Sequence, residues 1–482
     1  MFSQASRKAS KPQLTSLARA HRKYRRGALP RPDGFWFGRT LAAVAAFALV
    51  VTGGLAAAAP SSATETRQSY IVVLKDGVVD PGAAALAQQS AYGFTASKVY
   101  RHAVNGYAAT MTASQAQRVQ ANPNVDFVTM GRTFQKPQEP MSAGNQKVPF
   151  WRQRIAGTDS DVRRSLDNGP DRINVNVAVI DSGIDATHPD LNVKGGVDCQ
   201  SGSPVDVAHP VDVLGHGTFV AGVIGARNNG IGVVGTAPGT PLWSVRVVDN
   251  AGLISEESLI CAIDWVTSTR TDDNEDNDIA VANISIAGGG PDTPNCGKGV
   301  DPMHYAICRS VRAGVTYAVA AGNAGEDFAN TVPATYDQVL TATAIGDFDG
   351  KAGGKAAPKC GTQNWARFGQ KDDRPAFFSN FATTPADKAH TVAAPGMCIL
   401  STAPGGYGVE DGTSFASPAV AGSVALCISQ NECTGSAEDI MEQYLHVTAS
   451  YTKRHMDYGF GGDPVHPVGT KYFGYLTQTV SF

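Results

Sequence analysis

Four widely separated residues have the side-chain types that transfer of an acyl group requires, namely Asp181, His216, Asn323 and Ser414. A serine hydroxyl can act as a nucleophile and a histidine can accept its proton. A carboxylate can orient the histidine, and an amide N–H can stabilise an oxyanion. Each residue alone has an ordinary alternative role in a turn, a helix start or a cap. Together they form a candidate catalytic group for nucleophilic attack on a carbonyl carbon.

Ser414 stands near the start of the segment DGTSFASPAVAGSVAL (411–426), which turns from small polar residues to almost wholly apolar ones. A helix that is apolar on nearly every face is typical of the core of a large domain. We expect Pro418 to lie in the first turn of this helix, where its missing N–H would be unpaired anyway. This places Ser414 at or just outside the helix N-terminus, where a serine is commonly an N-cap.

Alternating strands and helices surround the four residues. Apolar runs predict strands at 175–181, 241–249, 278–287, 314–322 and 338–346, and helices at 217–226, 254–268, 303–314 and after Ser414. This alternation predicts an α/β fold, a three-layer domain with a mostly parallel central sheet. Functional residues in such sheets lie beyond the carboxyl ends of the strands. Asp181 ends the first of these strands, and Asn323 follows the fourth.

Longer motifs contain all four residues: DSGIDATHPDL, GHGTFVAG, VAAGNAG and GTSFASPAVAG. In this order they resemble the motifs of the subtilisin-like serine peptidases, the subtilases of the subtilisin and proteinase K type. The resemblance covers about residues 148–462. It implies the subtilisin-like three-layer fold and a serine endopeptidase that hydrolyses peptide bonds through an acyl-enzyme.

The resemblance also implies a role for each residue of the group. Ser414 would attack the scissile carbonyl carbon, and His216 would take the serine proton. Asp181 would hold the tautomer of the imidazole and stabilise the imidazolium. The side-chain amide of Asn323 and the backbone N–H of Ser414 would bind the oxyanion.

Two stretches, NISIAGGG (283–290) and AAGNAG (320–325), resemble the walls of the family's substrate cleft. The substrate would lie extended along an exposed strand edge. Small residues there predict a neutral pocket and cleavage after apolar residues, although the family usually has glycine where Ala287 stands. The predicted substrate-binding residues are Ser285, Ile286, Ala287, Gly288, Ala321 and Gly322.

The stretch GARNNGIGVV (225–234) resembles the family's calcium loop. The resemblance implies a structural Ca²⁺ held by the side chains of Asp190 and Asn229 and by the backbone carbonyls of Arg227, Ile231 and Val233. Ligands that are all oxygen atoms suit this ion. One further ligand normally comes from the mature N-terminus, which the sequence does not align. The alternative is an ordinary Asn-Gly turn.

The N-terminal third is typical of a precursor. Residues 1–59 are basic and then apolar, which predicts a cleaved secretory signal, with an uncleaved signal anchor as the alternative. Residues 64–135 resemble the family's inhibitory propeptide through NGYAATMT and NVDFVTMG, and form a small α/β unit. A Pro- and Gln-rich linker with the maturation site follows at 136–147. The peptidase domain then spans 148–462, and a tail of undetermined role spans 463–482.

Charge and cysteine content favour an extracellular protein. Residues 1–59 contain ten Lys or Arg and one acidic residue, whereas the rest of the chain contains 30 basic and 42 acidic residues. The acidic body argues against a nucleic-acid partner. All eight cysteines follow the leader, and none has zinc-site spacing, so disulfides are expected. Close spacing favours Cys296–Cys308 and Cys427–Cys433, and the pairing of the other four stays open.

We therefore expect a secreted monomer that acts on protein or peptide substrates, has its own propeptide as inhibitor, and has no membrane contact after signal cleavage. A non-catalytic secreted binding protein on the same fold is the alternative, disfavoured because all four catalytic positions are filled. The sequence from Gly230 to Gly235 fits G-x-G-x-x-G, with Asp249 downstream. A nucleotide site needs a strand before this motif and a helix after it, and the predicted order is the reverse. An α/β-hydrolase is disfavoured because the second glycine of its nucleophile motif is missing after Ser414.

Overall fold

The computed structural model describes residues 66–134, 146–156, 173–208 and 210–482. The predicted leader and most of the predicted linker lie outside these described residues. Within the described part of the chain, no helix is both long enough and apolar enough to span a bilayer.

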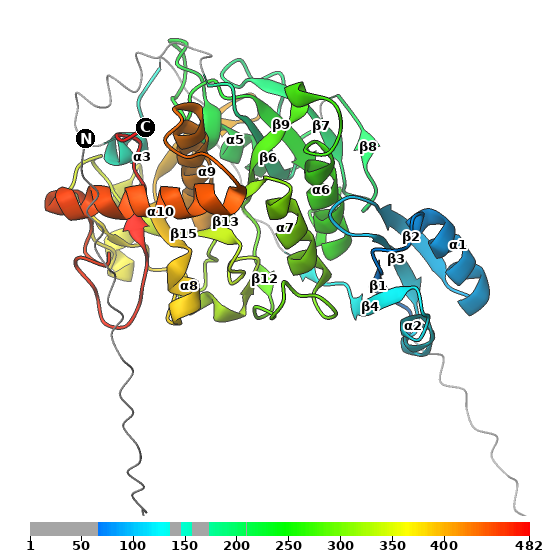
Figure 1. Cartoon of the computed structure of the whole chain (residues 1–482). Coiled ribbons are helices and arrows are strands. Elements are labelled where there is room, and N and C mark those ends of the chain that lie inside the picture. Colours follow the sequence, from blue (N-terminus) through cyan, green and yellow to red (C-terminus); the bar gives the residue numbers. More distant parts are fainter. Residues whose placement is uncertain (1–65, 135–145, 157–172, 209) are drawn as a thin grey trace, which may run out of the picture. The chain divides into compact units, whose positions relative to one another are not determined.

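Residues 68–130 form a four-stranded antiparallel sheet with two helices (Figure 1). Its strands are β1 (Gln68–Leu74), β2 (Thr95–Tyr100), β3 (Gly106–Met111) and β4 (Val125–Met130), in the order β2-β3-β1-β4. The helices are α1 (Pro81–Tyr92) and α2 (Ala113–Gln120). Both begin at a residue whose side chain accepts backbone N–H groups, Asp80 for α1 and Thr112 for α2.

A large sheet of mostly parallel strands occupies the centre of the rest of the chain. Its order is β22-β19-β15-β13-β11-β6-β9-β7-β8, with β18 antiparallel to β15 and β8 antiparallel to β7. The strands are β6 (Asn176–Asp181), β7 (Val193–Asp198), β8 (Val205–Asp206), β9 (Leu242–Arg246), β11 (Ile279–Ile284), β13 (Thr316–Ala320), β15 (Val339–Gly346), β18 (Arg374–Pro375), β19 (Thr391–Pro395) and β22 (Tyr475–Leu476). Central strands such as β15 are buried along their whole length, as expected for a sheet covered on both faces.

Helices pack on both faces of this sheet, so the three-layer α/β prediction is confirmed (Figure 1). They are α3 (Phe150–Ile155), α5 (His216–Gly225), α6 (Glu256–Ser268), α7 (Pro302–Arg312), α8 (Pro385–Ala389), α9 (Thr413–Ser429) and α10 (Ala437–Arg454). The five predicted strands and four predicted helices of this part all occur, with ends that differ by a few residues. Short two-stranded pairs complete it: β5 (Thr133–Phe134) with β10 (Ile254–Ser255), β12 (Gly288–Gly289) with β14 (Thr331–Val332), β16 (Lys359–Cys360) with β17 (Gln363–Asn364), and β20 (Ile399–Ala403) with β21 (Gly406–Glu410).

The prediction that Pro418 lies in the first turn of its helix is wrong. The helix α9 begins at Thr413, so Ser414 is its second residue and Pro418 lies inside it. A proline at this point cannot donate the helical hydrogen bond to the carbonyl of residue 414. The hydroxyl of Ser285 donates to that carbonyl oxygen at 2.6 Å instead, which satisfies it without the proline N–H. The helix has Gly412 as its N-cap, so Ser414 is not a cap.

The C-terminal tail is an integral part of the peptidase core. Its strand β22 extends the central sheet beside β19. Beyond it, Thr477 accepts a 2.5 Å hydrogen bond from the hydroxyl of Tyr458 through its carbonyl oxygen. Thr479 accepts one from the guanidinium of Arg152 at 3.0 Å. The tail therefore joins α3 to the far edge of the sheet, a packing role that the sequence did not indicate.

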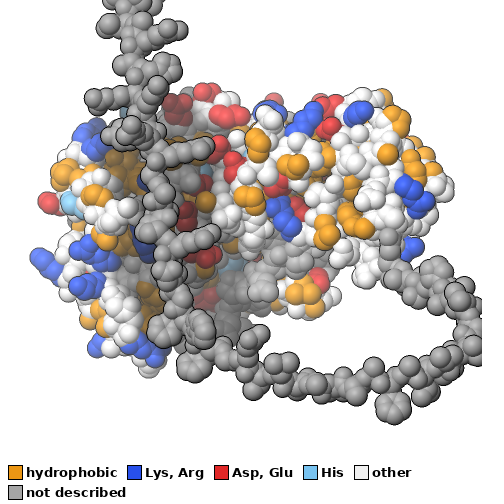
Figure 2. Space-filling view, turned by 90° about the horizontal axis from the view of Figure 1, so that it is seen from below, with side chains coloured by type: hydrophobic (Ala, Val, Ile, Leu, Met, Phe, Trp, Pro, Cys, Tyr) orange, Lys and Arg blue, Asp and Glu red, His pale blue; other side chains and the backbone are white. Residues whose placement is uncertain are grey.

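One face of the surface carries acidic and basic side chains intermixed with apolar and uncharged ones (Figure 2). Among the described residues, large exposed apolar side chains include Val79, Phe150 and Val211. Isolated exposed apolar residues of this kind are normal for a globular protein.

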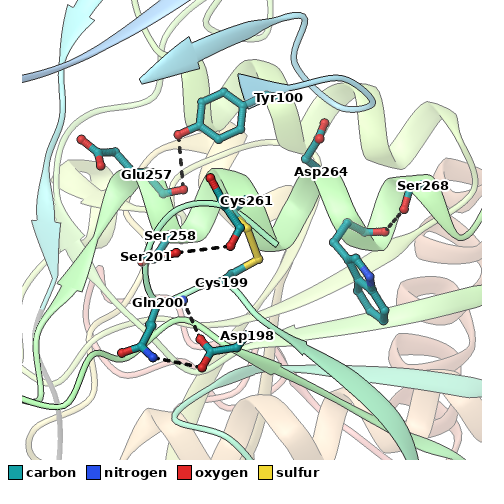
Figure 3. Close-up of a disulfide and its surroundings, with 12 residues drawn as sticks. Tyr100, Asp198, Cys199, Gln200, Ser201, Glu257, Ser258, Cys261, Asp264 and Ser268 are labelled. Carbon is teal, nitrogen blue, oxygen red and sulfur yellow. Dashed lines mark hydrogen bonds between the residues drawn. A yellow bond between two sulfur atoms is a disulfide. The ribbon is translucent and has the colours of Figure 1, made fainter. Parts of the chain in front are cut away.

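Four disulfides link the eight cysteines. The two predicted pairs, Cys296–Cys308 and Cys427–Cys433, are confirmed. The pairs that the sequence left open are Cys199–Cys261 and Cys360–Cys398. Cys199–Cys261 ties the segment after β7 to α6 and is drawn in Figure 3. It closes a loop of 62 residues, the longest of the four.

Loss of Cys199–Cys261 should destabilise the protein more than loss of Cys296–Cys308. The loops they close contain 62 and 12 residues, and loop-closure entropy predicts losses of about 4 and about 3 kcal/mol in the free energy of unfolding. Guanidinium unfolding of the two double Cys→Ser variants, followed by tryptophan fluorescence, measures both losses. A larger loss for the Cys296/Cys308 variant would show that loop length does not govern these disulfides.

Candidate active site

Asp181 and His216 form a buried pair at the carboxyl end of β6. Nδ1 of His216 lies 2.8 Å and 2.9 Å from the two carboxylate oxygens of Asp181. The backbone N–H of Ser182 donates a further hydrogen bond to the same carboxylate at 2.7 Å. Only 2% of Asp181 and 4% of His216 is exposed. The carboxylate therefore fixes both the ring orientation and the tautomer, with the proton on Nδ1 and the lone pair on Nε2.

The electrostatics of this pair favour the protonated imidazole. Burial lowers the pKa of His216, but the charge and hydrogen bond of Asp181 raise it, and Glu410 and Asp212 raise it further. The net result is a pKa above the ordinary value of 6.5. A carboxylate beside a histidine is the usual cause of such a shift, and it makes the imidazole a stronger base.

The N-terminus of α5, where His216 stands, is organised by Asp212. One carboxylate oxygen of Asp212 accepts the backbone N–H groups of Leu214 and Gly215, at 3.0 Å and 2.8 Å. The other accepts the N–H and hydroxyl of Thr218 at 2.8 Å and 2.5 Å. Sequence reasoning missed this residue. Its signal was an aspartate a few positions before a predicted helix start, where carboxylates satisfy unpaired N–H groups.

The hydroxyl of Ser414 points toward the end of β11. Its Oγ donates to the carbonyl oxygen of Ser285 at 3.3 Å. The ring of the next residue, Phe415, lies 5.4 Å from that of His216 between ring centroids, so the start of α9 packs on the histidine. Nε2 of His216 is buried and has no hydrogen-bond partner among the described residues. The structure thus brings the serine and the histidine to one place without a direct hydrogen bond between them.

Asn323, at the end of the segment after β13, is held by the first residue of α9. Its Oδ1 accepts the backbone N–H and the hydroxyl of Thr413, both at 2.9 Å. The same hydroxyl accepts the N–H of Gly322 at 3.1 Å. Because a backbone N–H can only donate, Oδ1 must face Thr413. Nδ2 is then the end of the amide that can donate to a bound group.

Comparisons with known proteins identify the family of this chain. Residues 172–461 match the Subtilase family. The chain belongs to the subtilase family. Residues 56–135 match Peptidase inhibitor I9. The protein is therefore a serine endopeptidase made as a proenzyme with an inhibitor-type N-terminal domain.

Similar proteins include Subtilisin E of Bacillus subtilis (strain 168), 30% identical over 89% of this chain and 97% of its own length. Subtilisin of Bacillus pumilus is 35% identical over 60% of this chain and 88% of its own. A crystal structure of a cold adapted subtilisin-like serine proteinase is 24% identical, with a TM-score of 0.48, over 69% of this chain and 98% of that one.

The predicted cleft residues of this subtilase follow two neighbouring strands. Ser285, Ile286, Ala287 and Gly288 follow β11, and Ala321 and Gly322 follow β13. Ser285 and Ile286 are buried, whereas Ala287 and Gly288 are partly exposed. Gly322 has φ +102°, and a Cβ there would lie 2.5 Å from Nδ2 of Asn380, so only glycine suits this bend before Asn323. Ser285 also supports α9 by its bond to the Ser414 carbonyl.

Asp190 lies against the loop after α5, which contains the other predicted calcium ligands. Asp190 is fully buried, its Oδ2 accepts the N–H of Val233 at 3.0 Å, and its Oδ1 accepts no well-formed hydrogen bond from the described residues. Asn229 accepts the N–H of Ile231 at 3.1 Å. The loop also includes Arg227, whose N–H donates to the Asp190 carbonyl at 2.9 Å.

Sequence reasoning missed Gln146, which lies against this loop. Its side chain accepts the N–H of Gly230 and donates to Oδ1 of Asn228. The next residue, Lys147, donates its N–H to the Gly232 carbonyl at 2.6 Å. Gln146 is thus the candidate for the ligand from the mature N-terminus, and nothing in its local sequence distinguishes it from other linker glutamines.

His216 should titrate above pH 6.5, and Asp181→Asn should move its pKa below that value, because burial remains while the stabilising charge is lost. In the wild type, protonation of His216 stabilises the folded state, and this stabilisation is fully present below pH 6.5. It is lost as the pH rises through the raised pKa of His216. NMR titration of the ring nitrogens measures both values. His390, whose pKa burial lowers to about 4, is an internal control that should not respond. An unchanged His216 pKa in the variant would contradict this electrostatic account.

Proposed function

We propose that this subtilase hydrolyses peptide bonds through Ser414 as nucleophile, His216 as general base and acid, and Asp181 as the group that orients the imidazole. The bidentate contact between Asp181 and His216, with Nε2 left unpaired, is the observation that carries the proposal. It presents a buried base of raised pKa beside the start of the helix that bears Ser414.

The reaction would begin with a rotation of the Ser414 side chain away from the Ser285 carbonyl and toward Nε2 of His216. The serine oxygen would then bond to the scissile carbonyl carbon while its proton passes to Nε2. Breakdown of the tetrahedral intermediate would return this proton to the leaving amine and leave an acyl-serine. A water molecule, deprotonated by the same nitrogen, would release the new carboxyl group and restore the enzyme.

Nδ2 of Asn323 and the backbone N–H of Ser414 would stabilise the negative oxygen of the tetrahedral intermediate. Support for Asn323 comes from the two hydrogen bonds that hold its Oδ1 on Thr413. A donor fixed before the reaction does not lose free energy in reorientation as charge develops. The N-terminal end of α9 favours the same negative charge.

We further propose that the precursor carries a cleaved secretory signal within residues 1–59, and that residues 64–135 act as an intramolecular inhibitor of peptide hydrolysis. Cleavage within 136–147 would release the secreted, monomeric peptidase. The N–H groups of Arg101, His102 and Ala103 all donate to the carboxylate of Asp264 on α6, which supports specific docking of the inhibitor unit. The disulfides are consistent with an oxidising compartment.

The intact mass of the secreted wild type beside Ser414→Ala tests this proposal. We expect only the wild type to be cut between about residues 135 and 148, because the cut requires the Ser414 nucleophile. The cut wild type should also hydrolyse casein, and the variant should not.

Two other outcomes are informative. Cleavage of both proteins would show that a second protease matures the chain, and the casein assay would then decide the role of Ser414. Absence of cleavage in both, together with absence of casein hydrolysis after separate removal of the propeptide, would contradict the proposed function. Such a protein would fit the alternative of a non-catalytic binding protein.

We propose that the loop after α5 binds a structural Ca²⁺. Oδ1 of the buried Asp190 accepts no well-formed hydrogen bond, although the side chains of Tyr407 and Asn229 interact with this carboxylate, so a cation would compensate its charge. Asp190 and the side-chain oxygens of Asn229 and Gln146 would hold the ion with the carbonyls of Arg227, Ile231 and Val233. These oxygen donors suit calcium. The ion would fix the loop to the mature N-terminal segment.

EDTA should therefore lower the melting temperature of the mature protein. At a calcium concentration about 100 times the dissociation constant, binding stabilises the fold by about 2.7 kcal/mol, or a shift of about 5 °C. The variant Asp190→Asn should melt at a lower temperature and respond little to EDTA. Differential scanning calorimetry with and without calcium measures both. Equal melting temperatures of the wild type in calcium and in EDTA would contradict the site.

A further inference from the structure

Arg132 follows β4, the last strand of the four-stranded sheet at 68–130. Its side chain fills a pocket on the peptidase part of the chain. Its Nε and Nη2 donate to Oε1 of Glu256 at 3.0 Å and 2.7 Å. Nη2 also donates to Oδ1 of Asp301 at 2.8 Å and to the hydroxyl of Tyr336 at 3.1 Å. The three pocket residues come from α6, from the N-cap of α7 and from the segment before β15. We call Glu256, Asp301 and Tyr336 the acidic pocket.

The acidic pocket places two carboxylates close together and out of water. Only 1% of Glu256 and 4% of Asp301 is exposed, and Tyr336 is fully buried. The hydroxyl of Tyr336 donates to Oδ2 of Asp301 at 2.8 Å, so all three residues are joined. Burial raises the pKa of Glu256, whereas the charge of Arg132 lowers it. Two buried carboxylates are costly unless a cation compensates them, and the guanidinium is the cation that does so here.

The backbone around Arg132 is bound as an extended peptide would be. The next two residues, Thr133–Phe134, pair antiparallel with Ile254–Ser255 in a two-stranded sheet of their own. The carbonyl oxygen of Arg132 accepts the backbone N–H of Glu256 at 2.9 Å. The backbone N–H of Arg132 donates to Oε2 of Glu256 at 2.7 Å.

Arg132 also lies against the wall of the predicted cleft. A Cβ on Gly290, the last residue of the wall 283–290, would lie 2.7 Å from Nη1 of Arg132. The arginine is therefore between β10 on one side and this wall on the other. An extended chain bound between two strand edges is the geometry of peptide recognition by β-augmentation, with side-chain pockets supplying specificity.

We propose that the acidic pocket is a specificity subsite that selects an arginine side chain of the substrate, on the N-terminal side of the bond to be cleaved. The inference rests on the proposed function, since it treats β5 as occupying the place of a substrate. Arg132 precedes the predicted maturation site within 136–147, which fixes the side of the bond. When the propeptide leaves, Glu256, Asp301 and Tyr336 remain with the peptidase and their compensating cation departs. An arginine side chain of the substrate would supply this cation again.

The pocket favours arginine over lysine. The guanidinium uses two nitrogens, Nε and Nη2, and three acceptor groups at once. A lysine has a single terminal nitrogen and no donor at the position of Nε, so it would neutralise the charge but lose a hydrogen bond. An uncharged side chain such as glutamine would leave both carboxylates without a cation.

Cleavage of internally quenched peptides by the mature wild type tests the subsite. The parent peptide has the sequence of residues 128–148, which includes the whole predicted maturation segment, and two further peptides carry Arg132→Lys and Arg132→Gln. We expect kcat/KM to fall about 10- to 100-fold for the glutamine peptide, as for loss of hydrogen bonds to charged groups, with the lysine peptide between the two. Equal values for the arginine and glutamine peptides would overturn the proposal and would mean that Arg132 only anchors the propeptide.

Matched variants locate the preference. In mature Glu256→Gln, the ratio of kcat/KM for the arginine and glutamine peptides should shrink toward one, whereas cleavage of the glutamine peptide should persist. Glu257→Gln is the control, because its side chain is the adjacent carboxylate on α6 and does not bond Arg132. Figure 3 shows Glu257 beside Tyr100, whose hydroxyl donates to the Glu257 carbonyl at 3.4 Å. A ratio in Glu257→Gln that falls as far as in Glu256→Gln would refute the assignment to this pocket.

A binding measurement separates failure of the subsite from failure of the proposed function. Ser414→Ala, freed of its propeptide through a foreign protease site placed within 136–145, is titrated with fluorescent forms of the same peptides. Tighter binding of the arginine peptide by about tenfold or more supports the subsite even if the wild type hydrolyses nothing. Equal binding, with casein hydrolysis by the wild type intact, overturns the subsite and leaves the peptidase function standing.

Discussion

The arrangement of the site depends on one hydrogen bond, from the hydroxyl of Ser285 to the carbonyl oxygen of Ser414. The proline at 418 leaves this carbonyl without its helical donor, inside a helix whose first fifteen residues are all buried. An unpaired carbonyl in such a place would be costly. The bond from Ser285 removes that cost and fixes the start of α9 to the carboxyl end of β11. The same turn reaches the next strand through Thr413 and Asn323.

Carboxylates at helix N-termini support both the histidine helix and the acidic pocket. Asp212 precedes α5, Glu256 is the first residue of α6, and Asp301 is the N-cap of α7. Asp212 and Asp301 accept N–H groups of their helices, and all three carboxylates lie near the positive end of a helix dipole. Asp212 is fully engaged within the peptidase and positions the histidine helix. Glu256 and Asp301 are also buried, but both of them accept hydrogen bonds from Arg132, a residue that precedes the peptidase part of the chain.

The sequence predicted the fold well because its signals are local. Apolar runs such as 175–181 and 338–346 gave the strands, and the motifs around Asp181, His216, Asn323 and Ser414 gave the site. The position of Pro418 was predicted wrongly because local propensity disfavours proline inside a helix, while the compensating donor, Ser285, is far away in the sequence. Gln146 and Arg132 were missed for a similar reason. Their roles depend on contacts with residues that are distant in the sequence, Gly230 for Gln146 and Glu256 for Arg132. No local sequence pattern predicts these contacts.

The proposed peptidase chemistry rests on activation of Ser414 by His216. Labelling of the mature wild type with a fluorophosphonate, followed by peptide mass mapping, tests it most directly, since such reagents phosphonylate activated serines. We expect a single adduct on the peptide that contains Ser414, with labelling strongly reduced in His216→Ala freed of its propeptide at a foreign protease site within 136–145, because this variant keeps the serine but lacks its base. An unlabelled Ser414 peptide, or equal labelling with and without His216, would show that His216 does not activate Ser414.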